Sequence, residues 1–329
     1  MKEKQIGNSD VTASVLGLGT WAIGGTFWGG SSTSESIKTI QAAIDEGINL
    51  IDTAPAYGFG VAEEVVGKAI QGQRDKVVIS SKCGLDWDNK RGTFVLHESG
   101  RDIYRYLGRE FLREELENSL RRLKTDYIDV YYTHWQDETT PLSEVMETLQ
   151  QFKKEGKIRA IGASNVTVET LKEYQALGGV DVGQEEYSLL HGKIEADILP
   201  YCRSQNVGMF AYCSLAQGLL TGKIAVDHQF KDGDMRGSMD SFSKENLHNS
   251  RLLNQKLGQI AEKYNITLTQ LIIAWTLAQA GITHVLCGAR QAEHVLENVK
   301  GAAVTLSDVD LKAISELGKA SGVTFAMGQ

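Results

Sequence analysis

Lys76-Val77-Val78-Ile79-Ser80-Ser81-Lys82 is the stretch of sequence that decides the fold. Its run of apolar residues is typical of a parallel strand that helices cover on both faces. Helical patterns stand on either side of it, over residues 62–70 and at about residues 112–124. A buried strand between two amphipathic helices predicts an α/β protein with a parallel sheet.

The same alternation of strand and helix continues along the whole chain. Strands are predicted at residues 15–18, 49–52, 76–82, 128–134, 158–164, 182–186, 208–212 and 284–287. Helical patterns follow these strands without a composition break or a linker rich in Pro, Gly and Ser. Eight such units predict a single α/β domain over residues 1–329, a (β/α)8 TIM barrel.

Local signals mark the ends of two predicted elements near the N-terminus. A turn at Gly7–Asn8 predicts a β-hairpin ahead of the barrel. A helix is predicted over residues 34–46, because Ser32 and Glu35 have the spacing of a capping box and Gly47 stands where a helix C-terminus favours glycine.

Two long polar connections, at about residues 84–108 and 218–250, each follow a predicted strand. The loops that follow the strands of such a barrel build its functional face. We therefore expect both connections beside the active site.

The composition is that of an ordinary globular enzyme, with 42% hydrophobic and 23% charged residues. A net charge of −8 argues against nucleic acid or an anionic membrane as a partner. The cysteines Cys83, Cys202, Cys213 and Cys287 form no C-x-x-C pair, so neither a metal site nor a disulfide framework is expected. Since no apolar run resembles a signal peptide or a membrane span, we predict a cytoplasmic protein.

The stretch Gly17–Ala22 matches the G-x-G-x-x-A fingerprint of dinucleotide-binding folds. That fingerprint requires a helix that opens within it and an acidic strand end about 20 residues later. Neither is present here, since the next helical pattern begins near Ser34. A glycine-rich loop that approaches a ligand closely is the better interpretation.

Four polar side chains lie at or just after the ends of three consecutive strands: Asp52, Tyr57, Lys82 and His134. Each alone could cap a helix, pack as an aromatic or reach water, but together they converge on one mouth of the barrel. A lysine beside a tyrosine should lower the phenol's pKa from its usual value of about 10, and an aspartate would hold that lysine.

These groups fit the protonation of a carbonyl oxygen. The tyrosine would give the proton, and a histidine N–H would stabilise the developing oxyanion. Because no side chain carries a hydride, this chemistry requires a nicotinamide cofactor.

At this point the chain resembles the aldo-keto reductase superfamily, in particular bacterial members that are also similar to potassium-channel β subunits. The resemblance covers essentially the whole length. It is carried by Leu16–Trp21, Ile51–Gly58, Ser81–Lys82, Thr133–His134, Gly162–Asn165, Gln184–Ser188, Ala211–Gly222 and Gly288–Arg290.

The resemblance implies that Tyr57 is the general acid, that Lys82 and Asp52 tune it, and that His134 orients the carbonyl. It also implies a set of residues that bind NADPH or NADP+. These are Thr20, Trp21, Asp52, Ser164, Asn165, Gln184, Tyr212, Ser214, Leu215, Gln217, Gly218, Gly288, Arg290, His294, Glu297 and Asn298.

Within that set, Ser164, Asn165 and Gln184 would bind the nicotinamide carboxamide, and the Tyr212 ring would stack on the nicotinamide. The pyrophosphate would be held by Ser214, Leu215, Gln217 and Gly218. Arg290 would bind a 2′-phosphate, which favours NADPH over NADH. His294 stands where relatives often have Arg or Gln, and neutral histidine offers less to a phosphate.

Four tryptophans near the strand ends predict an apolar substrate pocket for small aldehydes or ketones: Trp21, Trp28, Trp87 and Trp135. The sequence therefore predicts an NADPH-dependent reductase of carbonyl compounds. One rival is a barrel aldolase with Lys82 as a Schiff-base amine. Another is a redox-sensing regulatory subunit that binds NADP(H) and turns over slowly. The sequence does not decide between a monomer and a homo-oligomer.

Overall fold

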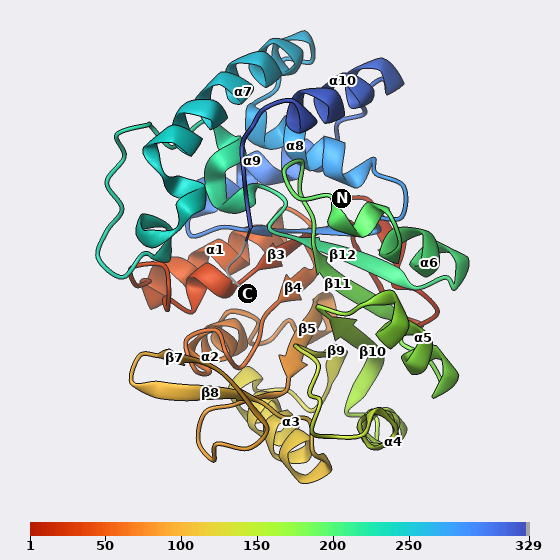
Figure 1. The fold of residues 1–329 in the computed structure, drawn as a ribbon. Helices are drawn as coiled ribbons and strands as arrows, with labels where there is room; N and C mark the ends of the chain where they lie inside the picture. The colour runs from red at the N-terminus through yellow and green to blue at the C-terminus, as the bar shows by residue number, and fades with distance from the viewer. Residues whose placement is uncertain (327–329) are drawn as a thin grey trace.

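A computed structural model describes residues 1–326 of the chain, and its centre is a closed barrel of eight parallel strands (Figure 1). The predicted (β/α)8 fold is confirmed. The strands, in the order in which they neighbour one another, are β3 (Leu16–Gly19), β4 (Leu50–Asp52), β5 (Val78–Cys83), β9 (Ile128–Thr133), β10 (Ile158–Ser164), β11 (Val182–Glu186), β12 (Gly208–Tyr212) and β13 (His284–Gly288).

Helices surround this barrel and connect its strands (Figure 1). They are α1 (Thr33–Asp45), α2 (Val61–Ala69), α3 (Arg109–Leu123), α4 (Leu142–Lys154), α5 (Val168–Ala176), α6 (Ile198–Ser204), α7 (Lys244–Lys263), α8 (Leu268–Leu277), α9 (Ala292–Ala302) and α10 (Asp308–Lys319). Buried apolar side chains join these helices to the core, as in α4, where Val145, Leu149 and Phe152 are fully buried.

The predicted N-terminal hairpin is confirmed as β1 (Glu3–Gln5) and β2 (Thr12–Ser14), which pair antiparallel. Its turn residues Ile6 and Val11 are fully buried against side chains of the barrel interior. That interior is filled by Leu50, Val78, Val130, Tyr132, Ala160, Val182, Phe210 and Leu286. The hairpin therefore closes the amino-terminal end of the barrel, and a site can open only at the other end.

The predicted capping box at the start of α1 is wrong. Ser32 is the N-cap residue, but its side chain caps no backbone N–H and its hydroxyl lies 3.2 Å from that of Ser34. Glu35 accepts a hydrogen bond from Lys38 instead. All of these side chains are exposed, so water satisfies the helix terminus and the spacing alone does not produce the motif.

The polar connection after β5 folds into a small antiparallel sheet beside the barrel mouth (Figure 1). Its strands are β6 (Leu85–Asp86), β7 (Thr93–Glu98) and β8 (Arg101–Arg105), with β8 in the middle. We call residues 84–108 the β-insertion.

The second long connection, residues 218–250, reaches back to the loop that follows β3. A backbone N–H of Gly29 donates to Gly233 at 3.1 Å, and that of Met235 donates to Phe27 at 2.9 Å. These bonds join the two loops beside the cavity described below. None of the helices within residues 1–326 is long and apolar enough to cross a membrane.

Candidate active site

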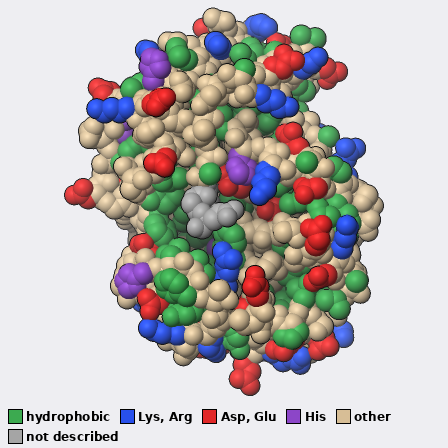
Figure 2. All heavy atoms as spheres, viewed as in Figure 1, with side chains coloured by type: hydrophobic (Ala, Val, Ile, Leu, Met, Phe, Trp, Pro, Cys, Tyr) green, Lys and Arg blue, Asp and Glu red, His purple; other side chains and the backbone are tan. Residues whose placement is uncertain are grey.

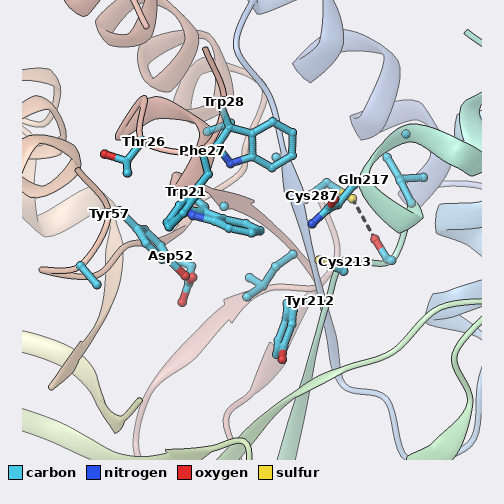
Figure 3. A pocket seen from close by; sticks show the side chains of 18 of the residues that line it. Trp21, Thr26, Phe27, Trp28, Asp52, Tyr57, Tyr212, Cys213, Gln217 and Cys287 are labelled. Atoms are coloured by element: carbon cyan, nitrogen blue, oxygen red, sulfur yellow. Dashed lines mark hydrogen bonds between the residues drawn. The ribbon is translucent and has the colours of Figure 1, made fainter. Parts of the chain in front are cut away.

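A cavity of about 550 Å3 opens at the carboxyl ends of the barrel strands. Hydrophobic side chains and some charged ones border the hollow near the middle of this face (Figure 2). In the close view, Trp21 and Trp28 face the cavity from one side and Tyr212 and Gln217 from the other (Figure 3). The volume is in the range of about 300–1,000 Å3 that small-molecule sites occupy.

Lys82 is the centre of the predicted catalytic group, and it is only 1% exposed. Its Nζ donates to Asp52 Oδ2 at 2.8 Å, to the backbone oxygen of Thr53 at 3.0 Å and to Tyr57 Oη at 3.1 Å. All three ammonium protons are therefore in use. Burial lowers the pKa of Lys82, and the carboxylate of Asp52 opposes that shift.

Asp52 is fixed from its other oxygen as well. Ser80 Oγ donates to Asp52 Oδ1 at 2.8 Å and Gln184 Nε2 donates to the same atom at 2.9 Å. The side chain is 3% exposed, so a buried charge is paired and fully hydrogen-bonded, as its desolvation requires. Asp52 thereby connects Lys82 on β5 to Gln184 on β11.

The expected lowering of the Tyr57 pKa is wrong for this structure. Burial raises the pKa of Tyr57 well above 10, and the negative charge of Asp52 adds to that shift. The Lys82 ammonium does not reverse it, because Asp52 carries an opposing charge 2.8 Å from that ammonium. The phenol is consequently protonated at neutral pH, which is the form that can give a proton.

His134 lies across from Tyr57, with ring centroids 6.1 Å apart and the planes nearly perpendicular. Burial lowers the pKa of His134 well below 6.5, and the positive charges of Lys82 and Arg105 lower it further. The imidazole is therefore neutral at pH 7 and has one N–H to donate. Asp52, Tyr57 and His134 line the cavity, while Lys82 lies behind Tyr57.

The ends of β10, β11 and β12 bring further amide and hydroxyl groups to the cavity. Asn165 donates from Nδ2 to the backbone oxygen of His134 at 2.9 Å and accepts from Tyr212 Oη at 2.7 Å. Ser164 Oγ donates to the backbone oxygen of Gln184 at 2.7 Å. These bonds hold polar side chains at the rim of the cavity beside His134.

Glu185 supports this rim from behind. Its Oε1 accepts the backbone N–H of Val166 at 2.9 Å, directly after Ser164 and Asn165. The side chain is 6% exposed. Burial raises the pKa of Glu185 from 4.5 to about 8.

We expect this carboxyl to make the stability of the protein depend on pH. Above pH 4.5 the unfolded chain releases the Glu185 proton, while the folded protein keeps it up to about pH 8. The free energy of unfolding therefore falls as pH rises through this window, by up to about 1.4 kcal/mol per pH unit. Urea denaturation of the wild type and of Glu185→Gln between pH 5 and 8 measures the slope. Parallel curves for the two proteins would contradict the assignment.

The far end of the cavity is rich in basic side chains. Lys223 is paired with Glu297, and Arg236 is paired with Asp234 at 2.7 Å. Arg290 is exposed and donates only to the backbone oxygen of Trp28, at 3.2 Å. Among these three cations of the described chain, Arg290 is the one without a carboxylate partner.

The cavity is lined by all but two of the residues predicted to bind the cofactor or the substrate. Thr20 is fully buried and donates to the backbone oxygen of Asp52 at 2.9 Å. Trp87 lies against Phe59 with ring centroids 5.3 Å apart, and Phe59 is the ring that faces the cavity.

Sequence reasoning did not identify several other lining residues. They are Phe27, Phe59, Val95, Leu96, Ile103, Arg105, Cys213, Thr221, Lys223 and Arg236. Many lie on the two long connections, whose position at the functional face is confirmed. No sequence motif marks these individual residues as part of a site. The described residues contain no group of three or more His, Cys, Asp or Glu side chains that could hold a metal ion.

A closed eight-stranded parallel barrel with a cavity at the carboxyl ends of its strands is the architecture of an enzyme. A profile of the Aldo/keto reductase family matches residues 15–319. The chain belongs to the aldo-keto reductase family, whose members act on small carbonyl substrates.

Individual relatives agree with this assignment. The NADH-specific methylglyoxal reductase of Escherichia coli is 40% identical over 97% of this chain and 99% of its own. The structure of a glycerol dehydrogenase from Gluconobacter oxydans is 35% identical, covers 99% of this chain and 98% of its own, and superimposes with a TM-score of 0.87. An aldo-keto reductase of Klebsiella pneumoniae, solved in complex with NADPH, is 28% identical over 100% of both chains with a TM-score of 0.74.

Proposed function

We propose that the protein reduces aldehydes or ketones to alcohols with NADPH, and that Tyr57 is the general acid. The hydrogen-bonded chain from Asp52 through Lys82 to Tyr57 supports this proposal most directly, because it ends on the hydroxyl of a residue that lines the cavity. His134 faces the same space from the next strand of the barrel.

Each residue of the quartet has a distinct role in the proposed reaction. Tyr57 gives its proton to the carbonyl oxygen, and Lys82, 3.1 Å from the phenol oxygen, stabilises the phenolate that is left. Asp52 keeps the ammonium charged and in place. His134 donates its N–H to the carbonyl oxygen and orients it. Since the pKa of His134 is lowered and that of Tyr57 is raised, neither titrates near pH 7.

The cavity fits a dinucleotide cofactor at its far end. A Cβ atom built on Gly288 would meet no neighbouring atom closer than 3.9 Å, so the backbone there leaves room for a ligand to approach. Arg290 supplies a cation that has no carboxylate partner among residues 1–326, as a phosphate requires. When bound, the nicotinamide cofactor would supply the hydride. We assign its binding to the cavity-lining residues Trp21, Asp52, Ser164, Asn165, Gln184, Tyr212, Ser214, Leu215, Gln217, Gly218, Gly288, Arg290, His294, Glu297 and Asn298.

The geometry of Lys82 disfavours the aldolase alternative. A Schiff base requires a neutral amine that faces the substrate. Lys82 is 1% exposed and lies behind Tyr57, and its three protons are donated to protein oxygens. A slow regulatory subunit would keep the same quartet, so the turnover number separates it from a reductase.

The direct test mixes the protein with NADPH and benzaldehyde and follows the loss of reduced-cofactor absorbance. NADH is run in parallel with the same aldehyde. We expect steady consumption and formation of benzyl alcohol. If neither cofactor is consumed faster than with Tyr57→Phe, the reductase proposal fails.

A second experiment tests the cofactor preference, which we assign to Arg290. Removing its guanidinium in Arg290→Ala should lower kcat/KM for NADPH by about tenfold, the loss expected for one charge-assisted contact, and leave NADH unchanged. Lys300→Ala removes one exposed positive charge from the same region and serves as the control. If the ratio of kcat/KM with NADPH to kcat/KM with NADH is unchanged in Arg290→Ala, Arg290 does not set the cofactor preference. A wild-type protein that prefers NADH would instead share the preference named in the Escherichia coli relative.

A further inference from the structure

We propose that Arg105 binds an anionic group on the substrate, so that the preferred substrates are carbonyl compounds that carry a carboxylate or a phosphate. This inference rests on the proposed reductase function and names its substrate class. The reaction itself is unchanged. A hydride from the reduced nicotinamide reaches the carbonyl carbon, Tyr57 gives its proton to the oxygen, and the alcohol keeps its acidic group.

Arg105 is placed at the catalytic end of the cavity by the β-insertion. It is the last residue of β8 and pairs with Leu85 of β6 on one side and with Thr93 of β7 on the other. Its side chain lines the cavity, and its guanidinium carbon lies 4.5 Å from the centroid of the Trp135 ring. Trp135 directly follows His134, so this cation stands next to the residue that would orient the carbonyl.

Arg105 differs from every other basic residue of the β-insertion in having no ion pair within the described chain. Lys90 and His97 contact Asp102 at 2.7 and 2.9 Å, Arg91 contacts Asp86 at 2.8 Å, and Arg101 lies 3.9 Å from Asp88. Among residues 1–326, no carboxylate lies within 4.0 Å of the Arg105 guanidinium, and its buried Nε has no hydrogen-bond partner.

An unpaired cation at this place has a physical cost. Burial lowers the pKa of Arg105, and the more distant charge of Glu138 opposes that shift only in part. The surrounding wall is apolar, with Val95, Leu96 and Ile103 lining the cavity beside it. Because Arg105 lines the cavity, an acceptor that enters the cavity and reaches its guanidinium would offset this cost.

The stacking on Trp135 leaves the guanidinium suited to an oxyanion. An arginine that stacks on an aromatic ring uses its flat face, and its N–H edge stays free for two parallel hydrogen bonds. Carboxylate and phosphate oxygens match that edge in geometry and in charge. Among the carboxylates nearby, Asp52 is committed to Lys82, and Glu98 lines the cavity without contacting Arg105.

Matched substrates test the inference. We compare para-carboxybenzaldehyde with its neutral methyl ester, and glyceraldehyde phosphate with glyceraldehyde, at low salt. We expect kcat/KM to be higher for at least one anionic member by about tenfold or more, as a charge-assisted hydrogen bond provides, mainly through KM. An advantage for only one pair identifies carboxylate or phosphate as the ligand. The absence of an advantage in both pairs overturns the inference.

Variants connect that advantage to Arg105. Arg105→Met should abolish it, and Arg105→Lys, which keeps the charge but loses the paired N–H edge, should keep part of it. If the Arg105→Met protein does not fold, Arg105→Gln is used in its place. Lys90→Met removes an exposed charge from the same insertion and should keep the full advantage.

Failure of this inference can be distinguished from failure of the proposed function. If the protein reduces the neutral aldehydes, and the anionic substrates keep their higher kcat/KM after Arg105 is replaced, only this inference is contradicted. No oxidation of NADPH or NADH with any of the aldehydes contradicts the proposed function itself.

Discussion

Replacing Tyr57 with phenylalanine should lower kcat for aldehyde reduction by about 10²- to 10⁴-fold, the usual contribution of a positioned general acid. The ring contacts with Trp21 and His134 would remain, since only the hydroxyl is lost. Cofactor binding should therefore change little. Initial rates measure the first effect, and quenching of tryptophan fluorescence on titration with NADPH measures the second.

Tyr212→Phe is the matched control for this variant. Tyr212 also lines the cavity and is largely buried, but its hydroxyl donates to Asn165 rather than contacting Lys82. We expect its loss to affect the affinity for the cofactor more than the chemical step. A Tyr57→Phe protein that keeps more than a tenth of the wild-type kcat would show that another group gives the proton.

Lys82→Met should cost both stability and activity. The Asp52 carboxylate is only 3% exposed, and this substitution removes its counter-ion. Breaking a buried pair from one side lowers the free energy of unfolding by about 3–5 kcal/mol. The phenolate of Tyr57 would also lose its nearest positive charge, so kcat should fall by about 10²-fold or more. Guanidinium chloride denaturation and initial rates measure the two effects.

The double variant Asp52→Asn, Lys82→Met separates the two effects. It removes the unpaired charge as well as the ammonium, so it should recover much of the lost stability. Activity should not return, because nothing then stabilises the phenolate. Equal stability of the single and double variants would mean that the charge of Asp52 is not the source of the loss.

The sequence predicted the barrel well because each strand has a local signature. The limits of β10, β11 and β12 agree with the predicted residues 158–164, 182–186 and 208–212. Apolar runs that end in polar residues mark both the strand and the face at which it ends. The same pattern placed Asp52 and His134 at one mouth before any contact was known.

The β-insertion was harder to predict, because β7 and β8 are mostly exposed or half-buried and lack the continuous burial of the barrel strands. One signal was present. Ser99 and Gly100, with φ of +48° and +78°, form a tight hairpin turn between β7 and β8. Even with that turn recognised, the sequence could not show that Arg105 would lie on Trp135, since such a contact depends on how the insertion folds over the barrel.

Two predictions were wrong because they depended on burial, which the sequence does not show: the direction of the Tyr57 pKa shift and the place of Trp87. The direction of the Tyr57 pKa was misjudged since the sequence gives its charged neighbours but not the water removed around the phenol. Trp87 was assigned to the pocket by its place in a loop, yet Phe59 lies between it and the cavity.

The N-terminal hairpin has a consequence for how protons reach the site. Because the hairpin and the interior side chains fill the amino-terminal end of the barrel, the described residues leave Tyr57 no route to water along the barrel axis. The hydrogen bonds of Lys82 lead on to Asp52 and Thr53, which are both buried, so within the described residues this path does not reach the surface either. The phenolate left by each turnover must therefore be reprotonated through the mouth, after the alcohol has moved aside. Substrate entry, product release and reprotonation of Tyr57 therefore all use the same opening of the cavity and must follow one another. A molecule bound in that opening would block all three.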